Sequence, residues 1–337
     1  MSPAAPAPLA MTMGEPAGIG GEIALMAWLR RGERGLPPFF LIDDPARLSA
    51  LAAAIGLAVP VRAVADPAEA AAVFPTALPV LPQPLSAPVA AGRPDPANGG
   101  AVIAAIDRAI DLCRAGAAAA MVTLPIQKSS LYAAGFRHPG HTEYLAERGG
   151  AAGAPVMMLV GGGLRVVPVT IHIPLREVAT RLTAADIVAA GRTTAVGLAR
   201  DFGIERPRLA VAALNPHAGE SGTIGREEID IVAPAVAALQ AEGIAATGPH
   251  PADTLFHAGA RPRHDAVLCM YHDQALIPLK TLDFAGGVNV TLGLPFIRTS
   301  PDHGTALDIA GTGRADPESL IQAVALAGAL AGRRAAA

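Results

Sequence analysis

Three histidines of the sequence each lie in the loop that follows an apolar run. They are His172 after VPVTI, His217 after VAALNP and His272 after VLCMY. In open α/β sheets, ligands bind just beyond the carboxyl ends of the strands, so the three rings stand where a site forms. Three neutral imidazoles with one open position are the ligand set of a catalytic divalent-metal centre. Their spacings of 45 and 55 residues exceed any local metal motif, and ordinary loop histidines hydrogen-bonded near the surface are the alternative.

The residues beside two of these histidines favour a site. NPHAGE, residues 215–220, is a turn-forming sequence whose polar groups can orient the ring of His217 through its second nitrogen. YHDQ, residues 271–274, places four functional side chains directly after a strand-like run. A purely structural loop rarely needs that density of functional groups, so the local context strengthens the metal-site interpretation.

Two further groups of residues could bind an anion. His141 and Thr142 stand at the start of a probable helix over 143–148, whose N-terminal N–H groups form a natural anion seat. The alternative is a helix capped by Thr142 with the ring of His141 in solvent. Two cations and an amide, each nine residues from the next, follow His272 and would suit a phosphorylated acidic substrate, although a lone Lys or Arg is usually a solvated surface charge. These residues are Lys280, Asn289 and Arg298.

The elements that must position these residues alternate short apolar runs with amphipathic stretches, which predicts an α/β fold. The expected strands are 121–124, 155–160, 165–171, 208–214, 265–270 and 288–292. The expected helices are 98–114, 184–202 after the cap Thr183, 226–242, and one that starts at Asp316-Pro317.

The domain organisation is only weakly marked in the sequence. We expect a split arrangement, with a terminal domain of 1–135 plus 290–337 and a middle domain of 136–289. The proline-rich segment 70–96 is predicted to be an extended excursion over the surface.

The composition excludes several classes of protein. The chain of 337 residues is 51% hydrophobic and 16% charged, with a net charge of −3 and 4% aromatic residues, which argues against disorder and against a nucleic-acid partner. The longest uncharged stretch, 70–92, contains five prolines, so it cannot be a membrane helix. The N-terminus lacks the basic start of a secretory signal, and the two cysteines, Cys113 and Cys269, fit buried free thiols. We therefore expect a cytoplasmic protein with no membrane partner.

The common nucleotide-binding motifs are absent from the sequence. It contains neither a P-loop nor the dinucleotide fingerprint G-x-G-x-x-G. The glycine-rich segment 14–21 precedes a helix, but its spacing is wrong for that fingerprint. By itself it indicates only a tight turn, at the edge of a site or elsewhere.

From about residue 11 to 325, the chain resembles the 4-hydroxythreonine-4-phosphate dehydrogenases of pyridoxal phosphate biosynthesis. Seven motifs in the same order carry the resemblance, and the last is long enough to be highly specific. They are GEPAGIG (14–20), GHTE (140–143), NPHAGE (215–220), REEID (226–230), PADTLF (251–256), MYHDQ (270–274) and GVNVTLGLPFIRTSPDHGTALDIAG (287–311).

The resemblance implies a homodimer of two-domain α/β/α subunits of the isocitrate/isopropylmalate dehydrogenase-like type, with the active site in the cleft and at the dimer interface. It implies His172, His217 and His272 as ligands of one divalent metal (zinc, magnesium or cobalt), with His272 contributed by the neighbouring subunit. The residues that match the family's substrate contacts are His141, Thr142, Lys280, Asn289 and Arg298.

The resemblance also places a cofactor and acid–base groups. Residues 303–311 look like the adenosine-binding loop of the isopropylmalate dehydrogenase group, which implies NAD, or NADP, without a Rossmann fingerprint. Lys280, Asp273 and Asp253 are the expected catalytic acid–base residues. The expected cofactor residues in that loop are His303, Gly304, Asp308 and Gly311.

The implied reaction is the NAD- and metal-dependent oxidation of 4-phosphooxy-L-threonine at C3, followed by decarboxylation to 3-amino-2-oxopropyl phosphate. Some relatives carry other residues at Thr223, Gln127 and Ala275, and these departures leave the substrate open. One alternative is a dehydrogenase of a phosphorylated sugar acid or a cyclic dihydrodiol. A more distant one is a non-redox protein that binds phosphate esters, like the related acyltransferases.

Overall fold

The computed structural model of the protein describes residues 7–138 and 140–336. The chain divides into two compact units. Unit 1 lies within Met1–Ala151 and Leu294–Ala337, and unit 2 is Ala152–Gly293. Each unit has its own α/β core, as the alternating sequence pattern predicts.

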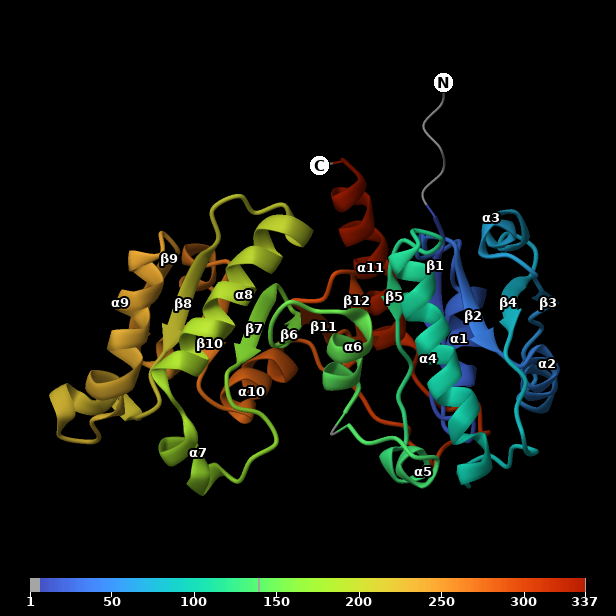
Figure 1. Ribbon diagram of the computed structural model, residues 1–337, viewed down its shortest axis with the longest axis horizontal. Helices are drawn as coiled ribbons and strands as arrows, with labels where there is room; N and C mark the ends of the chain where they lie inside the picture. Colours follow the sequence, from blue (N-terminus) through green and yellow to red (C-terminus); the bar gives the residue numbers. More distant parts are fainter. Residues whose placement is uncertain (1–6, 139, 337) are drawn as a thin grey trace. The chain divides into compact units, whose positions relative to one another are not determined.

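Unit 1 is built on parallel strands in the order β3-β4-β2-β1-β5-β12 (Figure 1). Because parallel strands need crossover connections, a helix or a long loop follows almost every strand. The strands are β1 (Leu9–Thr12), β2 (Phe39–Asp43), β3 (Val61–Ala63), β4 (Leu78–Pro82), β5 (Met121–Val122) and β12 (Arg298–Pro301).

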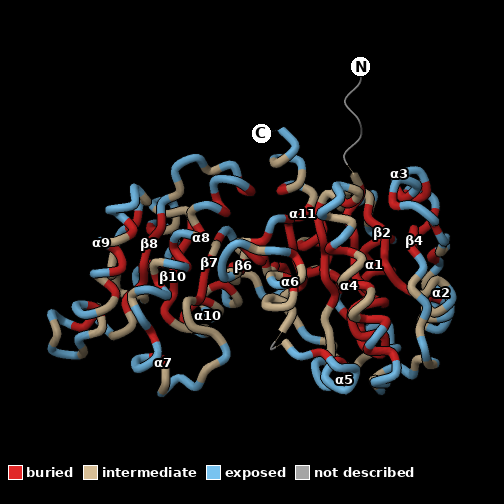
Figure 2. The backbone as a smooth tube through the Cα atoms, viewed as in Figure 1, coloured by how far each residue is buried: buried red, intermediate tan, exposed pale blue. Residues whose placement is uncertain are grey.

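Helices cover both faces of the unit 1 sheet, with α4 on one face and α1 and α11 on the other (Figure 1). The strands β1, β2, β5 and β12 are therefore buried on both sides, whereas the edge strand β3 is largely exposed (Figure 2). The α-helices are α1 (Gly20–Leu29), α2 (Pro45–Ala54), α3 (Ala70–Val73), α4 (Gly99–Arg114), α5 (Lys128–Ala133), α6 (His141–Gly149) and α11 (Glu318–Ala336); short 3-10 turns are η1 (Pro67–Glu69) and η2 (Pro96–Asn98).

The prediction that residues 70–96 form an extended excursion over the surface is wrong for the middle of that segment. Residues 78–82 form β4, which pairs with β2 and β3, and Leu78 and Val80 are fully buried. The prolines at 79 and 82 masked this strand, because proline cannot donate to a ladder and usually marks an edge or a loop. Burial of the apolar side chains between two neighbouring strands outweighs the missing donors.

Unit 2 has strands in the order β11-β6-β7-β10-β8-β9. The β7–β10, β10–β8 and β8–β9 pairs are parallel, whereas the β11–β6 and β6–β7 pairs are antiparallel. The strands are β6 (Val156–Gly161), β7 (Leu164–Pro168), β8 (Arg208–Ala212), β9 (Ala245–His250), β10 (Ala266–Cys269) and β11 (Val288–Leu292).

One helix of unit 2 follows its local sequence signals closely, and another differs from the prediction. α8 spans Ala184–Phe202, and the hydroxyl of Thr183 accepts the N–H of Asp186 at 3.1 Å as its cap. The helix predicted over 226–242 is instead a π-helical turn followed by a shorter α-helix. The remaining elements are η3 (Pro216–Gly222), the π-turn η4 (Glu228–Val232), α7 (Leu175–Arg181), α9 (Ala233–Ala241), η5 (Ala252–Thr254), η6 (Arg261–Arg263) and α10 (His272–Leu282).

The unit boundaries lie later than the domain boundaries expected at 135/136 and 289/290. Helix α6, which that expectation placed in the middle domain, packs against α4 within unit 1. Tyr144 of α6 donates to the carboxylate of Asp107 at 2.6 Å, which ties the two helices together. Across residues 7–138 and 140–336, no helix has the length and apolarity to cross a membrane.

Candidate functional site

The three strand-end histidines all lie in unit 2, after neighbouring parallel strands. His172 follows β7, His272 follows β10 and His217 follows β8, and β10 lies between the other two strands in the sheet. The carboxyl ends of parallel strands meet at one edge of a sheet, so the sequence-based placement of the three loops is correct at the level of the strands.

Two of the three rings come together in this chain. The ring centroids of His172 and His272 are 5.8 Å apart, and both residues line a cavity of about 260 Å³. The loop after β7 is fixed on the loop after β10, because the hydroxyl of Thr170 donates to the carbonyl of Met270 at 2.7 Å. His172 has a φ of 46°, a left-handed conformation that is costly for a residue with a Cβ and that is typical of functional sites.

His272 has the partner that a metal-binding imidazole requires. Its Nδ1 lies 2.7 Å from Oδ1 of Asp273, so Nδ1–H donates to the carboxylate. This hydrogen bond fixes the tautomer and leaves Nε2 as the nitrogen able to coordinate a metal. Asp273, expected from the resemblance as an acid–base group, here orients its neighbour's ring.

His217 begins a turn of unusual backbone. From 217 to 221, φ ranges between 45° and 76°, so five consecutive residues are left-handed. Four of them carry a Cβ, and a left-handed residue with a Cβ costs roughly 1–2 kcal/mol. A strained turn of this kind persists only where surrounding contacts hold it, and such turns cluster at ligand sites.

In the described part of the chain, no three His, Cys, Asp or Glu side chains lie close enough together to hold a metal ion. One chain thus brings His172 and His272 together and does not bring His217 to them. The donor set still fits a divalent ion, since all three side chains are imidazoles and one has an orienting carboxylate.

Helix α10 carries two of the other expected residues. Asp273 and Lys280 are seven residues apart and so share a helix face, with exposed Ile277 between them. The ammonium of Lys280 lies 5.3 Å from the ring centroid of Phe284.

The last two expected residues of unit 2 differ in environment. Asp253 lies in η5 and is exposed to solvent. Asn289 lies in β11, and its Oδ1 is buried without a hydrogen-bond partner among the described residues. A buried carbonyl oxygen without a partner is costly in a native protein, which fits a position that a ligand completes.

Unit 1 holds three of the expected anion-binding residues: His141 and Thr142 at the start of α6, and Arg298 at the start of β12. Arg298, only 4% exposed, donates from Nε and Nη2 to the hydroxyl of Thr123 at 3.0 and 2.7 Å. Burial lowers the pKa of Arg298 to about 10, so it stays cationic at neutral pH. A buried guanidinium bonded to a neutral hydroxyl keeps its attraction for an anion.

His141 lies in the field of this arginine. Burial, reinforced by the cations Arg298 and Lys128, lowers the pKa of His141 to about 3. The ring is therefore neutral at physiological pH, and its Nε2 is buried without a partner in the described part of the chain. Helix α6 begins at His141 with no side-chain cap, so its first N–H groups remain available. Together these features are suited to a phosphate or carboxylate, and we call them the anion seat.

The expected cofactor loop is held by a buried acid that the sequence reading missed. Both carboxylate oxygens of Glu22, which is fully buried in α1, accept backbone N–H groups of the loop, from Gly311 and from Gly313. Gly18 approaches the same loop so closely that a Cβ there would lie 2.9 Å from the carbonyl oxygen of Thr305. The loop and the glycine-rich segment 14–21 are therefore one packed assembly.

The expected cofactor residues of the loop differ in their surroundings. Nδ1 of His303 lies 3.0 Å from the carbonyl oxygen of Gly304, and its Nε2 is buried with no partner among the described residues. Asp308 is exposed, and Gly311 lines a cavity of about 640 Å³. The walls of this cavity include Pro16, Ala17, Gly18, Asp44 and Arg47.

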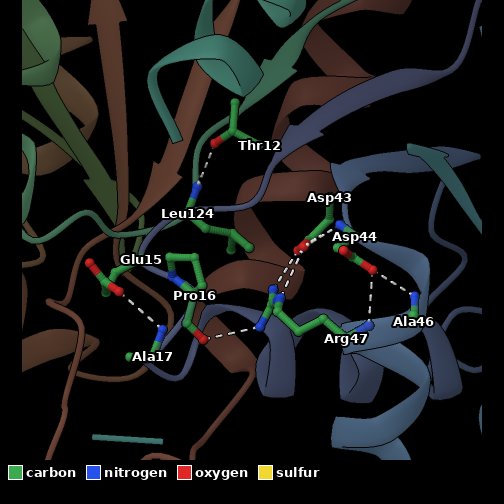
Figure 3. A network of polar contacts seen from close by, with 9 residues as sticks. All are labelled: Thr12, Glu15, Pro16, Ala17, Asp43, Asp44, Ala46, Arg47 and Leu124. Atoms are coloured by element: carbon green, nitrogen blue, oxygen red, sulfur yellow. Dashed lines mark hydrogen bonds and ion pairs between the residues drawn. The ribbon is translucent and has the colours of Figure 1, made fainter. Parts of the chain in front are cut away.

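An arginine fixes the wall of that cavity (Figure 3). Arg47 donates to both carboxylate oxygens of buried Asp43, at 3.0 and 2.5 Å, and to the carbonyl of Pro16 at 3.0 Å. Glu15 accepts the N–H of Ala17 at 3.1 Å, and burial raises the pKa of Glu15. The glycine-rich segment is thus held rigidly beside the cavity.

Sequence reasoning missed this wall because its parts are distant in the chain. The only available signal was the pair of acids, Asp43 and Asp44, that ends an apolar run after a glycine-rich turn. Lys128 was likewise not assigned: its Nζ lies 3.8 Å from the position of a Cβ at Gly140, and its charge helps to lower the pKa of His141.

The fold and these side chains define a two-unit α/β protein with strand-end histidines in one unit and an anion seat in the other. The chain belongs to the family of the pyridoxal phosphate biosynthetic protein PdxA, whose family model matches residues 36–327. The 4-hydroxythreonine-4-phosphate dehydrogenase of Caulobacter vibrioides is 56% identical to it over 332 residues, which is 97% of this chain and 98% of that protein.

Solved structures agree with this assignment. The crystal structure of 4-hydroxythreonine-4-phosphate dehydrogenase from Klebsiella pneumoniae is 41% identical, covers 96% of this chain and 99% of its own, and has a TM-score of 0.87. A terephthalate 1,2-cis-dihydrodiol dehydrogenase from Burkholderia xenovorans LB400 is 31% identical with a TM-score of 0.64, covering 95% of this chain and 96% of its own.

Proposed function

We propose that the protein oxidises 4-phosphooxy-L-threonine at C3 with NAD and a divalent metal, and that decarboxylation then yields 3-amino-2-oxopropyl phosphate. The observation that carries this proposal is the 56% identity, over 97% of the chain, to a relative named for that substrate. We place the subunit in the isocitrate/isopropylmalate dehydrogenase-like fold type on the same family resemblance.

His172 and His217 of one subunit, with His272 of the neighbouring subunit, are the proposed ligands of the metal, which we take to be zinc, magnesium or cobalt. The hydrogen bond from His272 to Asp273 supports this role, as do the left-handed backbones of the other two histidines. When bound, such an ion acts as a Lewis acid that lowers the pKa of a substrate hydroxyl. The three rings would hold it through their imidazole nitrogens, which are common ligands of such ions.

The proposed homodimer is supported by exposed apolar side chains on and after α10. Ile277 is 64% exposed, Leu282 is 45% exposed and Phe284 is 78% exposed. Large apolar groups that gather at one place on a monomer mark an interaction surface. A partner that covers this surface would also receive His272, which begins the same helix.

His141, Thr142 and Arg298 are the proposed residues of unit 1 that bind the substrate's anionic group, and Lys280 and Asn289 are those of unit 2. Arg298 keeps its charge in a buried site, and the neutral ring of His141 presents an unpartnered nitrogen. Both features favour a phosphorylated substrate over a neutral one.

NAD, or NADP, is proposed to bind through His303, Gly304, Asp308 and Gly311, and it supplies the hydride acceptor. Two observations support a cofactor at this loop: the cavity of about 640 Å³ that Gly311 lines, and the Nε2 of His303, which has no partner among the described residues. A cavity of that size lies within the range of small-molecule sites.

Lys280 is our proposed acceptor of the hydroxyl proton. Asp273, the other residue expected near that proton, is already engaged by His272 at 2.7 Å. Asp253, in a turn that packs against the turn of His217, is the proposed additional acid–base group.

A second candidate substrate is a cyclic dihydrodiol, which the 31% identical relative from Burkholderia favours by its name. The two substrates are separated by measuring kcat/KM for NADH formation from 4-phosphooxy-L-threonine, its unphosphorylated analogue and a cis-dihydrodiol. We expect turnover of the phosphorylated compound and at least a tenfold loss, about 1.4 kcal/mol, without the phosphate. Preference for the dihydrodiol would reverse the assignment. Absence of saturable NAD binding would favour a non-redox protein that binds phosphate esters.

A further inference from the structure

One buried carboxylate lies inside the left-handed turn that carries His217. Glu228, the first residue of η4, is 3% exposed. Its Oε1 accepts the backbone N–H groups of Leu214 at 2.8 Å and of Asn215 at 2.7 Å. Its Oε2 accepts Nδ2 of Asn215 at 2.9 Å. The carboxylate therefore binds both the backbone and the side chain of the segment that leads into His217.

The turn closes around this carboxylate. A Cβ at Gly219 would lie 2.6 Å from Oε2 of Glu228, so the chain passes directly over the oxygen. Gly219 is also left-handed, with φ of 76°. A larger residue there would therefore both collide with Oε2 of Glu228 and adopt a strained backbone. The shape of residues 214–219 is thus matched to a carboxylate at that point.

A neighbouring acid offers a natural comparison. Oε2 of Glu227 accepts Nδ2 of Asn215 at 2.7 Å, but among the described residues the Glu227 carboxylate accepts no backbone N–H of the turn. Glu228 differs because it accepts two backbone N–H groups, and because it begins a π-turn, a feature often found at functional sites.

We propose that Glu228 is a positioning residue, whose carboxylate holds the left-handed turn 217–221 and so aims the imidazole of His217 at the metal. The proposal rests on the proposed function, in which His217 is a ligand. Removing the carboxylate lets the turn relax to a right-handed or extended backbone, which rotates the ring away from the ion. Because a residue that orients a metal ligand acts through that ligand, its loss weakens metal binding while leaving the three histidines in place.

The test uses the full chain, stripped of metal with a chelator and titrated calorimetrically with cobalt(II) alone. Glu228→Gln keeps the volume but offers one acceptor oxygen instead of two, and Glu227→Gln is the matched control. We expect cobalt(II) to bind Glu228→Gln about 10–100-fold more weakly than wild type, and Glu227→Gln to stay within about threefold. In the metal-free proteins, hydrogen exchange at the N–H groups of Leu214 and Asn215 should be faster in Glu228→Gln only.

Wild-type cobalt affinity in a folded Glu228→Gln protein would overturn the inference, as would an equal loss in both variants. If Glu228→Gln does not fold, Glu228→Asp, which keeps the charge but shortens the side chain, takes its place with an expected loss of about 3–10-fold. Wild-type affinity in Glu228→Asp would then overturn it.

His217→Ala separates this inference from the proposed function. If His217→Ala binds cobalt(II) as tightly as wild type, the assignment of His217 as a ligand is wrong, and the inference falls with it. If His217→Ala loses affinity and Glu228→Gln does not, only the role of Glu228 is wrong.

Discussion

At the scale of single residues, the anion seat and the histidine loops show how burial sets the chemistry of a side chain. His141 is neutral at physiological pH because desolvation and two cations disfavour its charged form, while Arg298 keeps its charge in the same surroundings. His272 gains a fixed tautomer from a carboxylate one residue away. The charge that each side chain carries follows from its own intrinsic pKa together with its surroundings.

The depressed pKa of His141 has a consequence for stability. In the unfolded chain a histidine takes up its proton near pH 6.5, whereas folded His141 does so only near pH 3. Between these values the unfolded state binds one more proton, so stability falls as the pH falls through this window, by up to about 1.4 kcal/mol per pH unit.

We therefore expect the free energy of unfolding of His141→Gln to depend less steeply on pH than that of wild type. Urea unfolding from about pH 7 to about pH 4.5 measures this slope. His257→Gln, which alters an exposed ring, is the control and should keep the wild-type slope. Equal slopes for His141→Gln and wild type would show that His141 is not shielded from protonation in the folded protein.

At the scale of elements, local signals predicted some of the helices, whereas long-range packing decided elements that the sequence reading missed. Helix α8 and its cap Thr183 follow the sequence pattern, and so does the helix that begins beside Asp316, whose carboxylate accepts the N–H of Glu318 at 3.0 Å. Caps and amphipathic faces are encoded within a few residues of the element. Strand β4 was missed because its burial comes from pairing with β2 and β3, which its prolines conceal.

At the site, too, the features set by local sequence could be predicted and those set by long-range contacts could not. The strand-end positions of His172, His217 and His272 could be predicted because a strand and the loop that follows it are contiguous in sequence. The left-handed turn could not, since four of its five residues carry a Cβ and its conformation depends on Glu228. Nor could the wall formed by Arg47 and the glycine-rich segment, whose hydrogen bond to Pro16 spans 31 residues.

The left-handed turn gives a prediction about Ala218, whose φ is 53°. Ala218→Gly removes a strain of roughly 1–2 kcal/mol and adds chain entropy worth roughly 0.5–1 kcal/mol, so we expect unchanged or increased stability. Ala237→Gly, at an exposed position within α9, should instead lose about 1 kcal/mol. Urea unfolding of the two variants compares them directly, and an equal loss in both would mean that the turn is right-handed in solution.

At the scale of the whole molecule, the proposed activity needs a second copy of the chain. One chain brings two histidine rings to within 5.8 Å of each other, and among its described residues no third donor completes the set. Exposed apolar residues follow His272, one of these two histidines, along α10. In the proposed homodimer, His272 of the neighbouring subunit joins His172 and His217, and the same interface covers these apolar residues.

Replacement of both Ile277 and Phe284 by Ser should weaken the dimer. Sedimentation velocity is expected to show wild type at twice the chain mass of 34.0 kDa and the double variant shifted toward the single mass as it is diluted. Leu29→Ser, at a 41% exposed apolar residue of unit 1, is the control and should stay dimeric. A double variant as tightly dimeric as wild type would place the interface elsewhere.

The most direct test of the proposed activity is NADH formation from 4-phosphooxy-L-threonine by protein stripped of metal. We predict no NADH from the stripped enzyme, recovery when zinc, cobalt or magnesium is added back, and no recovery in His172→Ala, His217→Ala or His272→Ala. NADH formation that persists in the stripped enzyme, or in any of the three variants, would contradict a metal centre held by these histidines.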